Sequence, residues 1–81
     1  MIYRIRLFAA IRQRLGAEAA EVAGPSPCTA AELQARLAAD HPELASLIRQ
    51  SRMAVNAGYA APDRPVTPED EIALIPPVSG G

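Results

Sequence analysis

With 81 residues and a formal net charge of −1, the chain is long enough for one small domain and lacks the basic surplus of a general nucleic-acid-binding protein. It has no run of roughly 18 or more apolar residues, and arginines interrupt the N-terminal segment where a signal peptide would be apolar, so we expect a cytoplasmic protein without a membrane partner. The single cysteine excludes an internal disulfide and leaves too few thiols for a zinc site, so no metal site is expected.

The first segment predicts a strand, a short helical turn and a second strand. In residues 2–8, apolar side chains alternate with two arginines, which is typical of a strand with one buried face. Phe8 falls on the arginine face of this strand, the wrong side for the core. Helix formers follow, and Gly16 is placed to end a short helical turn. Residues 17–23 predict a second strand that pairs back on the first.

The basic residues are unevenly distributed along the chain. Residues 1–16 contain four arginines and no acidic residue, whereas the rest of the chain contains four arginines and nine acidic residues. Two interpretations stay open, a solvated strand face or a basic patch that meets an acidic partner. All eight basic residues are arginines, so the chain offers no lysine that could accept an isopeptide bond.

The clearest predicted element is a helix that begins near position 30. Thr29 and Glu32 have the spacing of a capping box, and leucines follow at helical intervals. Pro42 should end this helix near Asp40 and can open a short second helix. Residues 53–60 then predict a strand, a glycine-containing turn and the stub of another strand.

The last part of the chain completes the predicted fold. Residues 63–70 are typical of proline-rich turns, and residues 72–75 predict a final strand that a pair of prolines stops. The order of elements fits an α+β fold, a mixed sheet with one main helix packed across it. Ubiquitin and its relatives have this β-grasp order, with the last strand in the middle of the sheet. We therefore expect a β-grasp domain over residues 1–76 and a flexible, extended C-terminal diglycine tail over residues 77–81.

The sequence contains no conventional catalytic set. His41 follows a helix end, Cys28 has no second cysteine or supporting base in view, and the acidic residues 69–71 lack partners at metal-ligand spacing. What remains is a terminal carboxylate on Gly81. A carboxylate is a poor electrophile, so its use requires activation, typically as an acyl-adenylate made from ATP. Glycine suits this use because it has no Cβ and passes through a narrow channel; the alternative is a glycine-rich end without a function.

Three segments carry a resemblance to a known family. "RLFAAIRQRLG", "MAVNAGYA" and "DEIALIPPVSGG" resemble the small, sulfur-carrying subunits of molybdopterin synthase, a ubiquitin-like β-grasp family, and the resemblance runs essentially from Met1 to Gly81. It implies that an E1-like enzyme adenylates Gly81 with ATP and that a sulfurtransferase supplies the sulfur of a Gly81 thiocarboxylate. This sulfur would build the molybdopterin dithiolene on a cyclic pyranopterin precursor inside the large subunit. The resemblance also implies a heterotetramer of two small and two large subunits, in which the small subunit binds no cofactor and has no active site of its own.

The same resemblance implies which residues meet the partners. The family presents apolar residues on one sheet face and a basic residue in the first helical turn. Partner contacts are therefore expected at Phe8, Arg12, Leu74, Ile75, Pro76, Pro77, Val78 and Ser79, and the chemistry at Gly80 and Gly81. Three alternatives stay open: a sulfur carrier for cysteine biosynthesis, thiamine biosynthesis or tRNA thiolation, a ubiquitin-like protein modifier, and an interaction domain without terminal chemistry.

Overall fold

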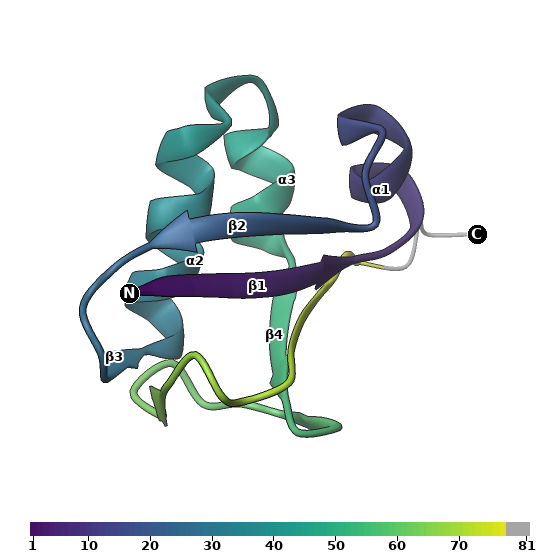
Figure 1. Cartoon of the computed structure of the whole chain (residues 1–81). Coiled ribbons are helices and arrows are strands. Elements are labelled where there is room, and N and C mark those ends of the chain that lie inside the picture. Colours follow the sequence, from purple (N-terminus) through teal and green to yellow (C-terminus); the bar gives the residue numbers. More distant parts are fainter. Residues whose placement is uncertain (78–81) are drawn as a thin grey trace.

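The computed structural model describes residues 1–77, whose elements are labelled in Figure 1. The strands are β1 (Ile2–Leu7), β2 (Ala19–Ala23), β3 (Cys28–Thr29), β4 (Arg52–Val55), β5 (Gly58–Tyr59), β6 (Pro65–Val66) and β7 (Ile72–Ile75). The helices are α1 (Ala9–Leu15), α2 (Ala30–Asp40), the 3₁₀ helix η1 (Pro42–Leu44) and α3 (Ala45–Gln50). Within residues 1–77, no helix has the length and apolar character needed to cross a membrane.

Five strands form one mixed sheet in the order β2-β1-β7-β4-β5. The last strand, β7, lies in the middle of this sheet, parallel to β1 and antiparallel to β4. Because β1 and β7 run in the same direction, the chain leaves β7 at the end of the sheet that is far from the N-terminus (Figure 1). The predicted α+β, ubiquitin-like β-grasp arrangement with a central last strand is confirmed.

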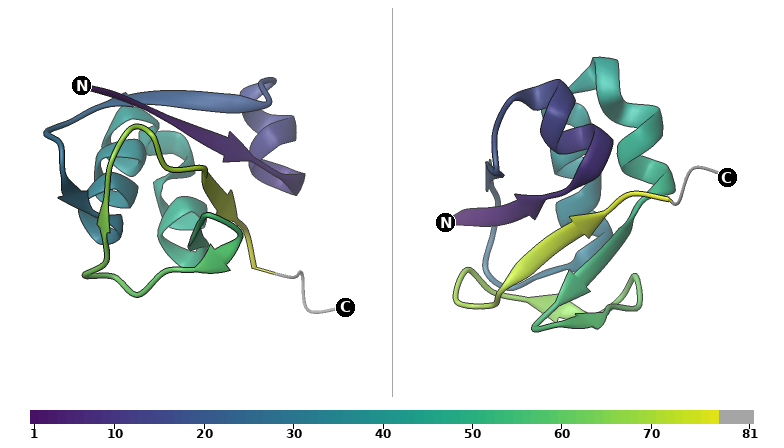
Figure 2. Two further views of the ribbon diagram at one scale, coloured as in Figure 1. Left: turned by 60° about the horizontal axis from the view of Figure 1, so that its bottom comes forward. Right: turned by 90° about the vertical axis from the view of Figure 1, so that its right-hand side faces the viewer.

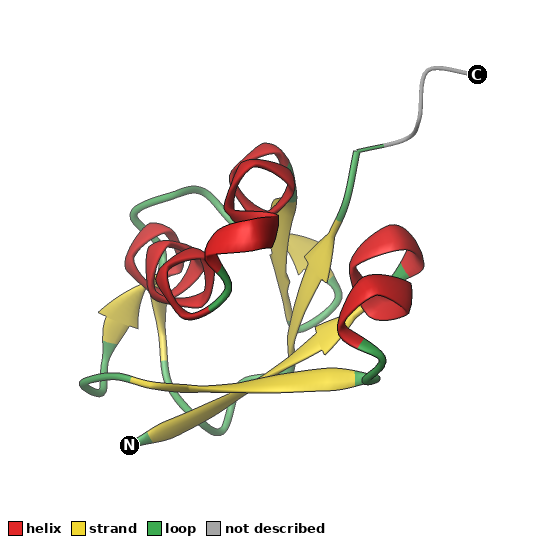
Figure 3. Ribbon diagram, turned by 90° about the horizontal axis from the view of Figure 1, so that it is seen from above, coloured by secondary structure: helices red, strands yellow, loops and turns green. Residues whose placement is uncertain are grey.

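Helices α2 and α3 lie side by side over one face of the sheet (Figure 3). Alternation along β1 turns Tyr3, Ile5 and Leu7 toward these helices, as predicted, and all three are buried. Each large apolar side chain that is fully buried contributes about 1.5–3 kcal/mol to folding. The largest fully buried side chains are Tyr3, Ile5, Leu7, Ile11, Val22, Leu33, Leu37, Ile48, Val66, Ile72 and Leu74.

The predicted capping box at the start of α2 is present. The backbone N–H of Glu32 donates to Thr29 Oγ1 at 3.1 Å, and Glu32 Oε1 accepts from the backbone N–H of Thr29 at 3.1 Å and from its hydroxyl at 2.9 Å. The hydrogen bond from the Thr29 hydroxyl, followed by that from the Thr29 backbone N–H, lowers the pKa of the Glu32 carboxyl from its ordinary value. The helix ends at Asp40, just ahead of Pro42, as the sequence predicts.

We expect Thr29→Ala to lower the free energy of unfolding by about 1 kcal/mol, because it removes the cap of the longest helix in the described chain. The depressed pKa of Glu32 sets the pH dependence: the contribution of the box is complete above the ordinary value of 4.5 and is lost as the pH falls through the lower folded-state value. Urea denaturation at several pH values measures both effects. Thr29→Ser keeps the hydroxyl and is the matched control; equal losses in both variants would show that the cap contributes nothing.

A second, two-stranded sheet was not predicted from the sequence. Cys28 pairs with Val66 and Thr29 with Pro65, so β3 and β6 are antiparallel partners. Residues 63–70 were predicted as turns, and that prediction is wrong for Pro65 and Val66, which form β6. The sequence did not reveal this strand because two residues are too few to show a periodicity. The pairing fixes residues 60–64, the segment between β5 and β6, against the start of α2.

Candidate partner-binding face

One face of the main sheet is not covered by helices. In the right-hand view of Figure 2, strands β1, β7 and β4 are seen with α2 and α3 beyond them. Side chains that alternate with the core residues point to this side and are exposed or half-buried. We call this surface the open face; its residues are Arg4, Arg6, Arg52, Ala54, Tyr59, Ala73 and Ile75.

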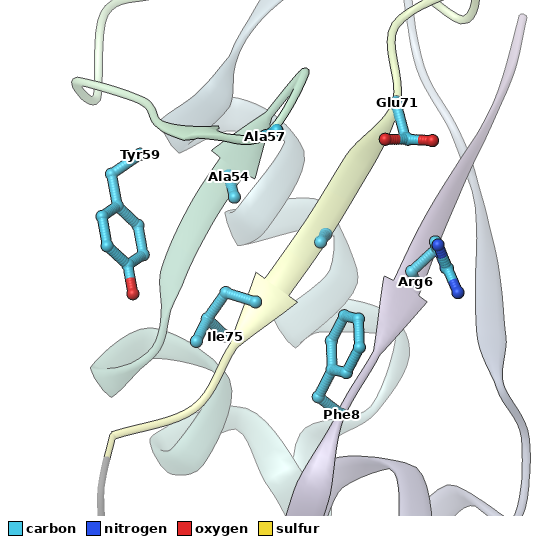
Figure 4. A pocket seen from close by; sticks show the side chains of 8 residues that line it. Arg6, Phe8, Ala54, Ala57, Tyr59, Glu71 and Ile75 are labelled. Carbon is cyan, nitrogen blue, oxygen red and sulfur yellow. The ribbon is translucent and has the colours of Figure 1, made fainter.

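The open face contains a hollow of about 360 Å³ (Figure 4). The hollow forms where two small side chains, Ala54 on β4 and Ala73 on β7, lie opposite each other and leave space above the sheet. The same row of the sheet continues to Tyr59 on one side and to Arg6 on the other. We call it the alanine hollow; it is lined by Arg6, Phe8, Ala54, Ala57, Tyr59, Glu71, Ala73 and Ile75.

Two arginines of the open face, Arg6 and Arg52, stack on neighbouring aromatic rings. The guanidinium carbon of Arg6 lies 5.8 Å from the centre of the Phe8 ring, and that of Arg52 lies 4.1 Å from the centre of the Tyr59 ring. A cation over an aromatic ring is attracted by the ring quadrupole, by about 0.5–1 kcal/mol at an exposed site. Stacking therefore holds Arg6 in the lining of the alanine hollow and holds Arg52 against Tyr59, another residue of that lining.

The turn between β4 and β5 is clamped to the start of β7. Asn56 donates its backbone N–H to Glu71 O at 2.8 Å and accepts from the Glu71 N–H at 3.0 Å. The Asn56 side chain also donates to Asp70 Oδ1 at 3.0 Å, while Asp70 Oδ2 accepts from the Thr67 N–H at 2.8 Å. The hydrogen bond from the Thr67 backbone, followed by that from Asn56, lowers the pKa of Asp70. The clamp fixes one rim of the alanine hollow.

The conformation of this turn differs from the predicted glycine-containing one. Asn56 and Ala57 have φ angles of 52° and 72°, while Gly58 is already the first residue of β5. Two successive residues with positive φ are typical of the tight hairpin turns that match the twist of paired strands. Asn tolerates this region, whereas Ala is strained in it. The clamp on Asn56 supplies the bonds that hold the strained turn.

A second hollow, of about 740 Å³, lies where the chain leaves β7. Phe8 and Ile75 border both hollows, so they form the ridge between them. Phe8 has an extended backbone, and Ala9 then takes a φ of 52°, which turns the chain sharply from β1 into α1. We call this the exit hollow; it is lined by Phe8, Ala9, Ala10, Gln13, Leu47, Ile75, Pro76 and Pro77.

The structure separates two neighbouring residues that were both expected at the partner surface. Phe8 is 36% exposed and lies at the open face, as predicted, and Ile75 is half-buried on the same side. Leu74 is 0% exposed and packs in the core, where it lies opposite Leu7 and Met53 in the sheet. The expectation of a partner contact at Leu74 is therefore wrong, because consecutive strand residues point to opposite faces.

Arg12, expected to contact a partner, is on the exposed side of α1. Its Nη2 lies 3.1 Å from Glu18 Oε1, and both side chains are more than half exposed. An exposed ion pair of this kind contributes about 0–1 kcal/mol, so a partner can replace Glu18 at little cost. The role of Arg12 stays a prediction.

Of the expected contacts near the C-terminus, the structure describes Pro76 and Pro77. Pro76 is half-buried and Pro77 is exposed, and both border the exit hollow. The residues expected to carry the chemistry and the remaining tail contacts lie outside the described part of the chain; they are Val78, Ser79, Gly80 and Gly81.

The other chemically interesting residues do not assemble. Among residues 1–77, no three His, Cys, Asp or Glu side chains come together as a metal site would require. Cys28 is 5% exposed in the core, and His41 is half-buried at the C-terminal end of α2. Within the described chain, the candidate site is therefore the open face with its two hollows.

Of the eight residues that line the alanine hollow, two, Phe8 and Ile75, were predicted from the sequence as partner contacts. Sequence reasoning did not assign Arg52, Ala54 or Tyr59 to a partner surface. The signal was available in "RMAVNAGY", where Arg52 and Ala54 alternate with buried Met53 and Val55. A tight turn after such a strand returns the chain antiparallel, which places Tyr59 opposite Ala54.

Comparison with known proteins agrees with this geometry. The family described as ThiS family matches residues 5–81. The molybdopterin synthase sulfur carrier subunit of Escherichia coli (strain K12) is 35% identical over 80 residues, with 96% of this chain and 98% of that protein covered.

Two solved structures share the fold. SAMP1 from Haloferax volcanii has a TM-score of 0.81 at 26% identity, with 100% of both chains covered. A chain in the complex of subunits 1 and 2 of molybdopterin-converting factor from Helicobacter pylori 26695 has a TM-score of 0.66 at 21% identity, again with 100% of both chains covered. The central last strand, the near-complete match to the sulfur carrier subunit and the family match agree: this chain belongs to the ThiS family, among the ubiquitin-like β-grasp sulfur carriers.

Proposed function

We propose that the chain is the sulfur carrier subunit of a molybdopterin synthase and that Gly81 carries the transferred sulfur as a thiocarboxylate. The observation that supports this most strongly is the 35% identity to the E. coli sulfur carrier subunit over nearly the full length of both chains. The fold supports it too, because β7 directs the chain out of the domain beside the open face.

The proposed chemistry takes place on the Gly81 carboxylate. An E1-like enzyme joins this carboxylate to AMP, consuming ATP and releasing pyrophosphate. A sulfur donor, supplied by a sulfurtransferase, displaces AMP and leaves a thiocarboxylate. Its sulfur then attacks a carbon of the pyranopterin precursor and displaces an oxygen substituent from it, and hydrolysis of the acyl–sulfur bond returns the Gly81 carboxylate and leaves the sulfur on the pterin. Two such transfers build one dithiolene.

In this proposal, the folded domain binds the partner and positions the C-terminal segment. From Pro76, the remaining residues reach roughly 20 Å when extended, enough to enter a partner's active site while the domain stays outside. The two prolines restrict the backbone at the base of this segment and reduce the entropy lost on insertion. In the same proposal, Phe8 and Ile75, which form the ridge between the hollows, contact the partner around the entrance.

The proposed partner is the large subunit of the synthase, in a heterotetramer of two small and two large subunits. The H. pylori complex of subunits 1 and 2 of molybdopterin-converting factor contains a chain of this fold, which supports a partner of this kind. The activating enzyme and the sulfurtransferase are further, transient partners in the proposal.

A second candidate function is protein modification. It is favoured by the similarity to SAMP1, which is H. volcanii small archaeal modifier protein 1. A modifier uses the same activated glycine carboxylate but forms an amide with a lysine of a target protein, so its product differs from a thiocarboxylate.

The test is the intact mass of the protein isolated from its host. We expect a fraction of the chains to carry the mass increase of one oxygen replaced by one sulfur, and tandem fragmentation should place this change on Gly81. Protein from a host that lacks the E1-like enzyme is the control and should show only the unmodified mass. Chains found only unmodified, or only as amide conjugates to other proteins, would contradict the sulfur-carrier function.

A further inference from the structure

The cations of the open face are not neutralised within the described chain. Among residues 1–77, the one ion pair with a nitrogen–oxygen distance within 4.0 Å joins Arg12 of α1 to Glu18. Arg6 and Arg52 therefore have no carboxylate at contact distance in this part of the molecule, although both are exposed. Their charges are available to a partner.

The positions of these two cations relative to the hollow are set by the sheet. Arg52 pairs with Ile75 across β4 and β7, next to the point where the chain leaves the domain. Arg6 pairs with Ala73, on the floor of the alanine hollow. Arg6 therefore lines the alanine hollow itself, whereas Arg52 lies just outside it, stacked on Tyr59, which lines the hollow on the side away from Arg6.

Stacking makes these arginines suitable for binding a carboxylate. A guanidinium that lies over an aromatic ring keeps its N–H groups pointing outward, in the fork that matches the two oxygens of a carboxylate. Tyr59, at 4.1 Å, supports Arg52 in this way, and Phe8, at 5.8 Å, supports Arg6 more loosely. Less rotational freedom is then lost when a partner binds.

The acidic side chains of the same surface lie at the other end. Figure 4 shows Glu71 at the end of the alanine hollow opposite to Phe8 and Ile75. Asp70 is engaged by Thr67 and Asn56. Near the start of β7 the open face therefore holds acidic residues beside Arg4 and Arg6, whereas near the end of β7 it holds Arg52 and apolar side chains.

We infer that Arg52, assisted by Arg6, selects the partner by charge, binding carboxylates of an acidic protein segment whose apolar side chain fills the alanine hollow. The inference rests on the proposed function, because it concerns the partner that receives the C-terminal segment. The carboxylates belong beside Ile75, which is the neighbour of Arg52 in the sheet, and a basic residue at that point of the partner would be repelled. The net charge of −1 and the Glu71 carboxylate on the rim favour a local acidic segment of a protein over a polyanion.

The test is the affinity of the carrier for the large subunit of molybdopterin synthase from the same organism, measured by calorimetry at low and at high salt. We expect Arg52→Gln to raise Kd about tenfold or more at low salt and Arg6→Gln about threefold, with both effects shrinking at high salt. Arg52→Lys should recover only part of the affinity, because it restores the charge but not the planar fork that stacks on Tyr59. Arg4→Gln is the matched control: it removes the same charge from the same face but near Asp70 and Glu71, and should change Kd less than twofold.

The controls separate this inference from the proposed function. Circular dichroism should show every variant folded, because these arginines are exposed. Phe8→Ala, which removes the apolar ridge, should raise Kd about tenfold at either salt concentration. If Arg52→Gln matches Arg4→Gln while Phe8→Ala still weakens binding, the charge selection is wrong and the carrier function stands. If the wild-type chain does not bind the large subunit at all, the proposed function is overturned, and this inference with it.

Discussion

Adding one residue after Gly81 should leave the melting temperature unchanged and reduce thiocarboxylate formation about 100-fold or more. The added residue moves the carboxylate by roughly 3.3–3.6 Å, whereas attack requires reacting atoms about 3–3.5 Å apart. Deleting Gly81 moves the carboxylate by a similar distance in the other direction. Gly81→Ala keeps the length but puts a methyl group where a narrow channel admits only hydrogen.

All three variants leave the core unchanged, so their folding should be that of the wild type. The measurements are thiocarboxylate formation with the cognate activating enzyme and molybdopterin production from the pterin precursor. The matched control adds the same residue before Met1, which is 67% exposed at the end of the sheet far from the exit hollow. A normal molybdopterin yield from the chain extended after Gly81 would refute the sulfur-carrier function, because no free glycine carboxylate would be needed.

Leu74→Ala and Ile75→Ala should have opposite consequences although the two residues are adjacent. Leu74 is fully buried, so truncating it should lower the free energy of unfolding by about 2–5 kcal/mol through lost burial and the cavity left behind. Ile75 is half-buried at the ridge between the two hollows, so Ile75→Ala should cost about 1 kcal/mol or less in stability. It should instead raise Kd for the large subunit about tenfold, as the loss of an apolar anchor does.

Urea denaturation and calorimetry with the large subunit measure these two effects. Leu74→Met provides a milder change that keeps the core nearly filled, with a cost below about 1.5 kcal/mol, and should bind normally. A stable Leu74→Ala variant with weakened binding would mean that the two faces of β7 are assigned the wrong way round.

Local physical chemistry determined much of this fold. The alternation along β1 required one buried face and placed Phe8 on the other. The hydroxyl of Thr29 and the carboxyl of Glu32 set the start of α2, and Pro42 set its end. These features depend on residues within a few positions of one another, so they can be predicted from the sequence. The sequence also predicted a central last strand, because the order of strands and helix is shared with few folds.

Contacts between distant segments decided the rest. No local feature of the sequence shows which of Leu74 and Ile75 is buried. The side of β7 that faces the core is decided by where α2 and α3 pack. The β3–β6 pair joins two residues to two others more than 35 positions away, which is beyond any periodic signal. The alanine hollow exists only because β1, β7, β4 and β5 lie side by side and bring Arg6, Ala73, Ala54 and Tyr59 into one row. The sequence by itself led to the chemistry proposed for Gly81; the tertiary structure decided which side chains form the open face, because a sheet face is assembled from strands that are far apart in the chain.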